Sequence, residues 1–318
     1  MKQIHLSLLL LLLPACSRED RPPKGPLVPG PVETGSLVDA RRGFKTKLPP
    51  NQANKEPVPA PPPKLFRTVH YDSPAGKLAA YLTPDPKDGK KRPAIIWITG
   101  GDCNSIDESC WKEGSPKNDQ SAAAFRKAGV VMMFPSLRGG NDNPGVKEAF
   151  LGEVDDVIAA ADFLGKQAFV DANRIYLGGH STGGTMALLV AECSDRFRAV
   201  FSFGPADDVS HYPPEFIPID LSNPREIQLR SPGRWLASIK SPTFVFEGTA
   251  QGANIDSLRT MARNSTNPKV HFLPISGADH FSLLAPINRY LADKILSDTG
   301  PTCNISITEE EARKAFGK

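Results

Sequence analysis

The sequence has neither a strong charge bias nor the residue spacing of a zinc site. Its formal net charge at pH 7 is only +3 over 318 residues, which is too small to indicate a nucleic-acid partner. It contains no C-x-x-C and no H-E-x-x-H, so no zinc site is expected. The apolar run at residues 6–13 is too short to span a bilayer.

The start of the chain has the pattern of an export signal. Lys2 precedes the short apolar run, as in a secretory signal peptide. Cys16, directly after this run, resembles the cysteine of a bacterial lipobox, and the resemblance implies removal of residues 1–15 and lipid attachment to Cys16. Because Ser17 follows the cysteine, we expect an extracytoplasmic protein anchored to a bacterial membrane, with the outer membrane favoured.

The next stretch is rich in proline and poor in large apolar side chains. Residues 17–63 hold twelve of the 31 prolines. Such a segment buries too little apolar surface to offset the entropy lost on ordering. We therefore predict a disordered tether over residues 16–64, one folded domain over 65–298 and a tail over 299–318.

Four cysteines remain once the lipidation candidate is set aside. An even number in an exported chain indicates two disulfides. Cys103 and Cys110 form the easiest local pair, and a bond between Cys193 and Cys303 would then tie the tail to the domain.

Short apolar runs alternate with helical patterns through the folded region, which predicts an α/β fold: a mostly parallel, twisted sheet with helices on both faces. Loops that follow the strands then share one edge of the sheet. The Pro-rich segment 205–241 interrupts the alternation and is interpreted as a small cap. Strands are expected at 67–83 (a hairpin), 93–99, 130–134, 175–177, 199–203, 243–246 and 270–274. Helices are expected at 119–128, 148–167, 185–191, 257–263 and 286–296.

The most informative motif is the G-x-S-x-G at residues 179–183, which contains Ser181. A short apolar run precedes it and a long apolar run follows it, which is the strand-turn-helix setting of a nucleophile elbow. A serine hydroxyl is a poor nucleophile until a base takes its proton. His280, in the loop after the last predicted strand, can supply that base because both loops open on the same sheet edge.

These stretches resemble an α/β-hydrolase, most closely the catalytic domain of the prolyl oligopeptidase-like and dienelactone hydrolase-like enzymes. The resemblance implies Ser181 as nucleophile and His280 as general base. It also implies an oxyanion hole from the N–H of Thr182 and one from Gly101 or Asp102, and it requires no cofactor or metal. The matching stretches are IIWITGGD at 95–102, FPSLRGGND at 134–142, GEVDDVIAAADFL at 152–164, VDANRIYLGGHSTGG at 170–184 and GADHFSLLAP at 277–286.

The acid of the triad is where the sequence departs from this group, because Gln251 occupies the position of the usual aspartate. Glu247 is the first candidate, since it ends a predicted buried strand at the sheet edge where the loops of Ser181 and His280 open. Burying a carboxylate without a partner costs free energy, so its presence there indicates a partner. Asp256 is a second, although it would also suit a helix N-cap. Asp208, or Asp207 beside it, follows the sixth strand and is the third.

The sequence thus predicts a serine hydrolase that cleaves carboxylic esters or short peptides through an acyl-enzyme. A small ester is the first expectation, since the stretch before the domain is too short for the propeller of the prolyl oligopeptidases. The alternative is an extracytoplasmic binding protein on a hydrolase fold, suggested by the missing aspartate. The oligomeric state is left open.

Overall fold

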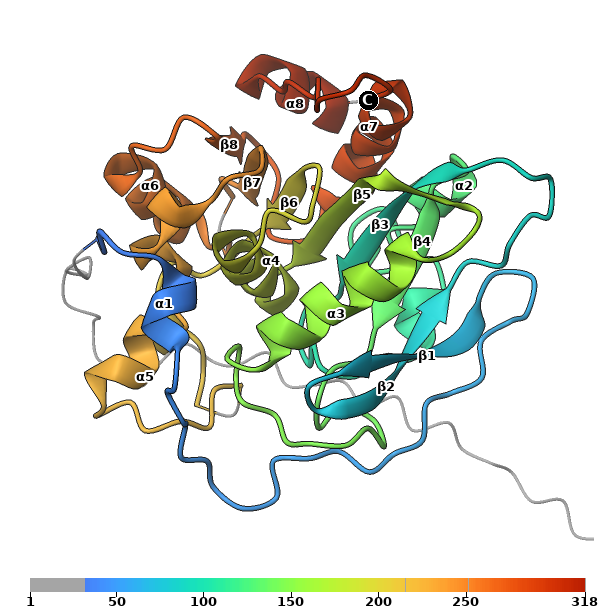
Figure 1. The fold of residues 1–318 in the computed structure, drawn as a ribbon. Coiled ribbons are helices and arrows are strands. Elements are labelled where there is room, and N and C mark those ends of the chain that lie inside the picture. The colour runs from blue at the N-terminus through green and yellow to red at the C-terminus, as the bar shows by residue number, and fades with distance from the viewer. Residues whose placement is uncertain (1–31, 215, 251, 318) are drawn as a thin grey trace, which may run out of the picture.

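The structure, a computed structural model, describes residues 32–214, 216–250 and 252–317, and these contain one sheet of eight strands. The strands are β1 (Arg67–Ser73), β2 (Gly76–Leu82), β3 (Arg92–Ile98), β4 (Val131–Pro135), β5 (Val170–His180), β6 (Val200–Phe203), β7 (Thr243–Gly248) and β8 (Val270–Ile275). They lie in the order β1-β2-β4-β3-β5-β6-β7-β8 (Figure 1). β2 is antiparallel to both of its neighbours and the other pairs are parallel, which confirms the predicted sheet.

Helices cover both faces of this sheet. The α-helices are α1 (Leu37–Arg41), α2 (Ala123–Lys127), α3 (Glu153–Gly165), α4 (Thr182–Cys193), α5 (Pro224–Gln228), α6 (Ile255–Asn264), α7 (Leu284–Ser297) and α8 (Glu309–Phe316). One apolar cluster joins α3, α4 and α6 to the sheet, and another joins α2, α7 and α8 to it. Alternate residues of β3 enter the two clusters, Ile96 the first and Trp97 the second, so the clusters lie on opposite faces.

Two helices are shorter than the sequence pattern predicts, and the backbone gives the reason. Ala122 has a left-handed φ of 45°, so α2 starts only at the next residue. Ala149 and Phe150 have φ values of 53° and 73°, which exclude a helix there and delay the start of α3 to Glu153. The residues before each helix instead form turns and irregular loops.

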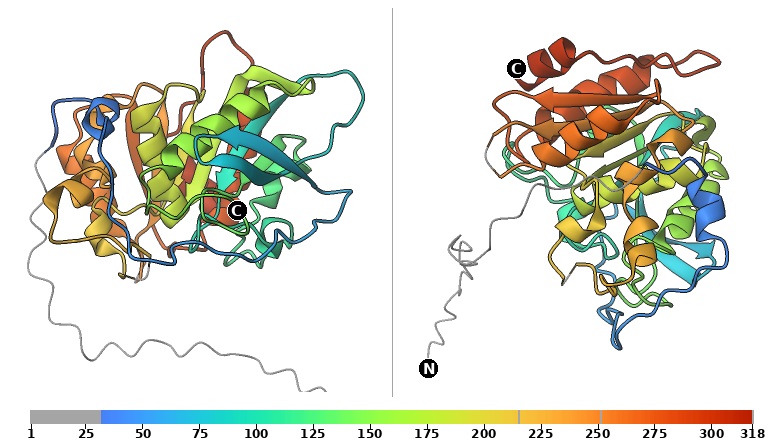
Figure 2. Two further views of the ribbon diagram at one scale, coloured as in Figure 1. Left: turned by 60° about the horizontal axis from the view of Figure 1, so that its bottom comes forward. Right: turned by 90° about the vertical axis from the view of Figure 1, so that its left-hand side faces the viewer.

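The described part of the predicted tether is not disordered but lies along the domain. Residues 32–64, which we call the strap, cross the molecule from α1 to β1 (Figures 1 and 2). The strap holds few apolar side chains, but hydrogen bonds dock it on a surface that the rest of the chain forms. The docking hydrogen bonds join Arg41 to Leu151 and Asp155, Thr46 to Glu226, Gln52 to Lys147, Asn54 to Gly139, and Pro59 to Tyr81.

The expected tail is also part of the fold, and it contains a helix that the sequence interpretation missed. Ala312 on α8 is fully buried, and Ile305 and Ile307 join the same apolar cluster as α7. Arg198 donates to the carbonyls of Gly300 and Thr302 and so holds the chain between the two helices. The folded domain therefore extends well past residue 298.

The two predicted disulfides are absent: the four cysteines that the structure describes are all free thiols. Cys103 lies in the apolar cluster of α3 and α4, whereas Cys110 lies in the cluster on the opposite face. Cys193 and Cys303 are divided between the two clusters in the same way. The two members of each predicted pair thus pack in different apolar clusters, and the structure contains neither bond.

The segment interpreted as a cap, residues 205–241, connects β6 to β7. It contains α5 and three short 3-10 helices, η2 (Val209–His211), η3 (Pro232–Arg234) and η4 (Leu236–Ser238). A further 3-10 helix, η1 (Glu108–Cys110), follows β3.

The predicted signal peptide and Cys16 lie outside the described residues, so export and lipidation stay predictions. Among the described helices, none has the length and apolarity needed to cross a membrane.

Candidate active site

Ser181 occupies a strained turn between β5 and α4. Its backbone has φ 55° and ψ −115°, and its N–H donates to the Phe203 carbonyl at 2.7 Å. Gly179 and Gly183 are packed so tightly that a Cβ on either would overlap neighbouring main-chain atoms. A non-glycine residue at this φ is uncommon and marks functional sites. The turn is the geometry of the nucleophile elbow that the sequence predicts.

His280 meets Glu247 at the same edge of the sheet. The distance from His280 Nδ1 to Glu247 Oε2 is 2.9 Å. Glu247 ends β7 and is fully buried, and its oxygens also accept the N–H groups of Gly248 at 2.6 Å and Asn254 at 2.9 Å. A buried carboxylate with three donors is well satisfied, and it fixes the orientation of the imidazole ring.

The end of β6 brings this pair toward the elbow. Phe203 accepts the Ser181 N–H, and the next residue, Gly204, lies under the His280 ring. A Cβ at Gly204 would lie 2.6 Å from His280 Nδ1 and 2.8 Å from Glu247 Oε2, and its φ is 58°, so only glycine fits. Among the described residues, no hydrogen bond occupies the Ser181 hydroxyl or His280 Nε2, which leaves both free for a substrate.

The other three acids considered from the sequence have different partners. Asp207 accepts from the Ser257 hydroxyl at 2.7 Å and lies 3.1 Å from His211 Nδ1. Asp256 is exposed on α6, where it pairs with Arg259. Asp208 caps η2 and pairs with Arg234 at 3.2 Å. The structure therefore brings Glu247, rather than any of these alternatives, to His280.

Main-chain N–H groups converge beside the elbow. Thr182 is the first residue of α4, so its N–H has no partner within the helix. Within the described residues, neither the Gly101 nor the Asp102 N–H donates a hydrogen bond. The Thr182 hydroxyl donates to the Gly101 carbonyl at 2.9 Å and ties the loop to the helix. These are the groups suited to hold an oxyanion. The Asp102 carboxylate is turned to Lys147, 2.8 Å from its Nζ.

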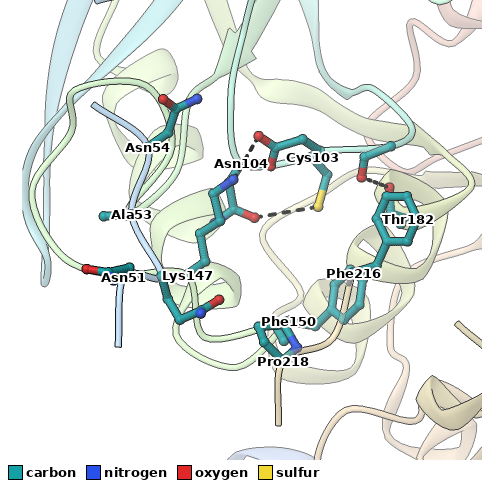
Figure 3. Close-up of a pocket in the computed structure, with 14 residues that line it drawn as sticks. Asn51, Ala53, Asn54, Cys103, Asn104, Lys147, Phe150, Thr182, Phe216 and Pro218 are labelled. Carbon is teal, nitrogen blue, oxygen red and sulfur yellow. Dashed lines mark hydrogen bonds and ion pairs between the residues drawn. The ribbon is translucent and has the colours of Figure 1, made fainter. Parts of the chain in front are cut away.

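A cavity of about 400 Å³ adjoins these N–H groups (Figure 3). Five segments line it, and three of them, the strap, the loop before α3 and the segment after η2, were not assigned to the site from the sequence. Their contribution carries no local motif, because it depends on how distant segments dock. The lining residues are Asn51, Gln52, Ala53, Asn54, Gly101, Asp102, Cys103, Asn104, Lys147, Ala149, Phe150, Thr182, Phe216 and Pro218.

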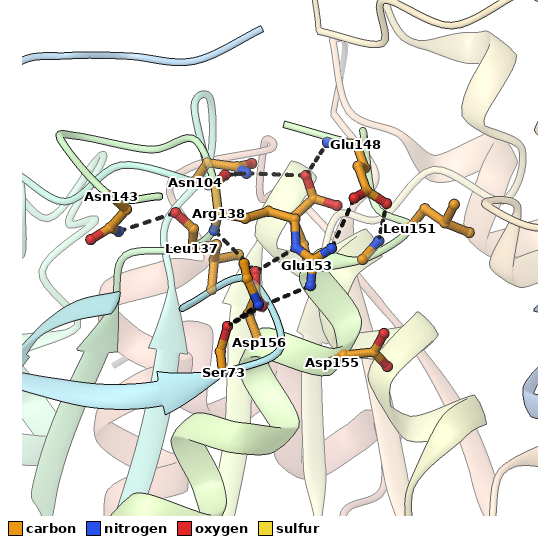
Figure 4. A network of polar contacts seen from close by, with 12 residues as sticks. Ser73, Asn104, Leu137, Arg138, Asn143, Glu148, Leu151, Glu153, Asp155 and Asp156 are labelled. Carbon is orange, nitrogen blue, oxygen red and sulfur yellow. Dashed lines mark hydrogen bonds and ion pairs between the residues drawn. The ribbon is translucent and has the colours of Figure 1, made fainter. Parts of the chain in front are cut away.

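A buried ionic network holds the loop before α3 that supplies part of this lining (Figure 4). Arg138 donates to both oxygens of Asp156 at 2.9 Å and to Glu148 at 2.9 Å. Burial acts to lower the pKa of Arg138, but the hydrogen bonds and charges of these two carboxylates outweigh it and raise that pKa. Glu153 accepts from the Asn104 side chain at 3.1 Å and the Glu148 N–H at 2.6 Å. Arg138 therefore shapes the cavity wall and is already occupied by protein carboxylates.

His180 connects the loop of His280 to the loop after β3. Its Nε2 lies 2.8 Å from the His280 carbonyl oxygen and its Nδ1 lies 3.0 Å from Gln120 Nε2. Since a carbonyl can only accept, Nε2 carries the proton and Nδ1 accepts from the amide. Gln120 Oε1 in turn accepts the Gly100 N–H at 3.2 Å. Burial, and then the charge of His280, lower the pKa of His180 to about 3, so it stays neutral at physiological pH.

This depressed pKa predicts a loss of stability on mild acidification. Between pH 6.5 and about 3 the unfolded chain protonates His180 and the folded chain does not, so the free energy of unfolding falls as pH falls. From pH 7.5 to 5.0 the wild type should lose about 2 kcal/mol more than a His180→Gln variant. Urea unfolding at both pH values measures this difference; equal losses in the two proteins would contradict it.

Comparison with known proteins agrees with the fold. A model of the prolyl oligopeptidase family matches residues 116–216, which is about a third of the chain. Prolyl oligopeptidase A of Amanita bisporigera is 34% identical over 142 residues, which cover 42% of this chain and 17% of that protein. The chain therefore spans under a fifth of the length of this curated relative.

Two solved structures extend the comparison over most of the chain. A puromycin-hydrolyzing peptidase of Mycobacterium tuberculosis superposes with a TM-score of 0.59 at 20% identity, covering 75% of this chain and 40% of that one. An acylaminoacyl peptidase of Pyrococcus horikoshii gives a TM-score of 0.55 at 15% identity, covering 78% and 43%. At these identities the likeness shows the fold. The chain thus has the α/β-hydrolase fold with the elbow of a serine hydrolase, and part of it is similar to the prolyl oligopeptidase family.

Proposed function

We propose that this chain is a serine hydrolase of carboxylic esters and short peptides, with Ser181 as nucleophile, His280 as general base and Glu247 as the acid that orients it. The observation that carries the proposal is the 2.9 Å contact between His280 Nδ1 and the buried Glu247 carboxylate, at the sheet edge where the elbow lies. The contact leaves Nε2, on the other side of the ring, to face a substrate. It also supports the enzyme over the binding-protein alternative, because Glu247 offers an acid in place of the aspartate that is missing at position 251.

The reaction has two halves. His280 Nε2 takes the hydroxyl proton while Ser181 Oγ attacks the substrate carbonyl, and the oxyanion accepts from the N–H groups of Thr182 and Gly101 or Asp102. The intermediate expels an alcohol or amine, which takes the proton from His280. Water then attacks the acyl-enzyme, again with His280 as base, and the acid leaves. The charge that develops on the imidazole is stabilised by Glu247.

The bond that is cleaved is a carboxylic ester or a peptide amide. The names of the similar proteins refer to peptidases, which favours amide bonds, but the chain spans less than half of each of them. The proposal therefore includes both substrate classes. A lipid anchor at Cys16 would place the enzyme at a membrane surface outside the cytoplasm.

A covalent probe and a substrate panel test the proposal. A fluorophosphonate should label the protein with a stoichiometry near one, and mass spectrometry should locate the adduct on Ser181. A panel of p-nitrophenyl esters beside aminoacyl p-nitroanilides should show turnover in at least one class and rank the two. A folded protein that is neither labelled nor active on any member of the panel would refute the proposal.

A further inference from the structure

The cavity of Figure 3 adjoins the proposed oxyanion hole. Its lining includes Gly101, Asp102 and Thr182, and it includes neither Ser181 nor His280. The leaving group must receive a proton from His280, so it departs on the histidine side. The part of the substrate that stays bonded to Ser181 is then the part that this cavity can hold.

The walls of the cavity differ in chemistry. Phe150, Phe216 and Pro218 form an apolar side, whereas Asn51, Asn54 and the Asp102–Lys147 ion pair form a polar side. Figure 3 shows the strap residues across the cavity from Thr182 and Phe216. A volume of about 400 Å³ is at the small end for ligand sites. It suits one acyl substituent the size of an aromatic ring with polar atoms beside it.

The strap wall is held in place on both sides of Ala53. The Lys147 N–H donates to the Gln52 carbonyl at 2.7 Å, and the Asn54 N–H donates to the Gly139 carbonyl at 2.7 Å. The approach is so close that a Cβ at Gly139 would lie 2.9 Å from the Gln52 oxygen. Main-chain bonds on either side leave Ala53 little freedom to move away from a substrate.

From this arrangement we propose that strap residues 51–54 set the upper size of the acyl group, with Ala53 as the residue that limits it. The inference rests on the proposed function, since it concerns the acyl group held at Ser181. A small side chain at position 53 admits acyl groups with an aromatic ring, and a large one in its place would fill the cavity while leaving the elbow and the histidine pair untouched.

Two esters with the same leaving group test the inference. p-Nitrophenyl phenylacetate and p-nitrophenyl acetate differ only by a phenyl ring. Ala53→Phe should lower kcat/KM on the phenylacetate at least tenfold relative to the acetate. The matched control is Ala60→Phe, the same substitution at an exposed strap residue outside the cavity lining, which should keep the ratio within about twofold of wild type.

The outcomes separate the two proposals. The role of the strap would be overturned if Ala53→Phe left the ratio of kcat/KM on the phenylacetate to kcat/KM on the acetate unchanged. An equal loss on both esters, in a variant of unchanged thermal stability, would overturn it in the same way. In either case, persistent probe labelling of Ser181 would leave the proposed function standing. Failure of the wild type to react with the probe would instead refute the proposed function. If Ala53→Phe folds poorly, Ala53→Val replaces it: a ratio lowered by at least twofold supports the inference, and an unchanged ratio overturns it.

Discussion

Replacing Ser181 with alanine is expected to lower kcat by about six orders of magnitude, the loss that follows removal of the nucleophile from a serine-hydrolase triad. The hydroxyl is the only part of the residue that the variant loses. The Ser181 N–H would still donate to Phe203, and alanine is under the same strain at φ 55° as serine. The elbow should therefore persist while acyl transfer stops. Initial rates on p-nitrophenyl acetate, followed over hours, measure the effect.

A matched substitution checks that the loss belongs to the nucleophile. Ser306 is exposed on the segment before α8, and Ser306→Ala should leave kcat and probe labelling unchanged. Ser181→Ala should lose labelling altogether and melt within a few degrees of wild type. Retention of more than one per cent of wild-type turnover in Ser181→Ala would show that another group attacks the substrate.

The sequence was informative where one short segment carries the chemistry. The elbow needs glycines beside a serine between a strand and a helix, and these requirements are local. Glu247 was chosen because a carboxylate at the end of a buried strand needs a partner, and the structure provides one in His280. The alternation of apolar runs similarly predicted the sheet, because both faces of a central strand must be apolar.

The sequence was misleading where the outcome depends on distant segments. The strap has the composition of a disordered chain, yet main-chain hydrogen bonds such as that of Asn54 to Gly139 dock it, and composition does not record them. The spacing of Cys103 and Cys110 favoured a disulfide between them, but the two free thiols pack in different apolar clusters. The cavity depends on the same docking, so its lining could not be read from the sequence.

Replacing Glu247 with glutamine is expected to lower kcat by three to four orders of magnitude, as loss of the orienting acid does in a serine-hydrolase triad. One carboxylate oxygen accepts from the Gly248 N–H, and the other accepts from the Asn254 N–H and faces His280 Nδ1. Glutamine has a single acceptor oxygen. If the amide oxygen faces His280, the amide NH₂ lies against the Gly248 N–H, so that two donors meet. If the amide oxygen faces Gly248, the NH₂ donates to His280 Nδ1 and favours the tautomer with its proton on Nε2, which cannot act as the base. In neither orientation does a negative charge stabilise the imidazolium.

Glu192 supplies the matched control for this change. It is also buried, at the end of α4 remote from Ser181, and its carboxyl oxygens have no hydrogen-bond partner among the described residues; burial raises its pKa well above the usual range. Glu192→Gln makes the same carboxyl-to-amide change at a side chain that, among the described residues, forms no hydrogen bond with His280, so kcat should stay within about twofold, far from the loss expected at Glu247. Probe labelling of Ser181 should slow in parallel with kcat in Glu247→Gln, because both reactions need the base. A near-normal rate in that variant would mean that another carboxylate orients His280, and Asp256 and Asp208 would be the next to replace.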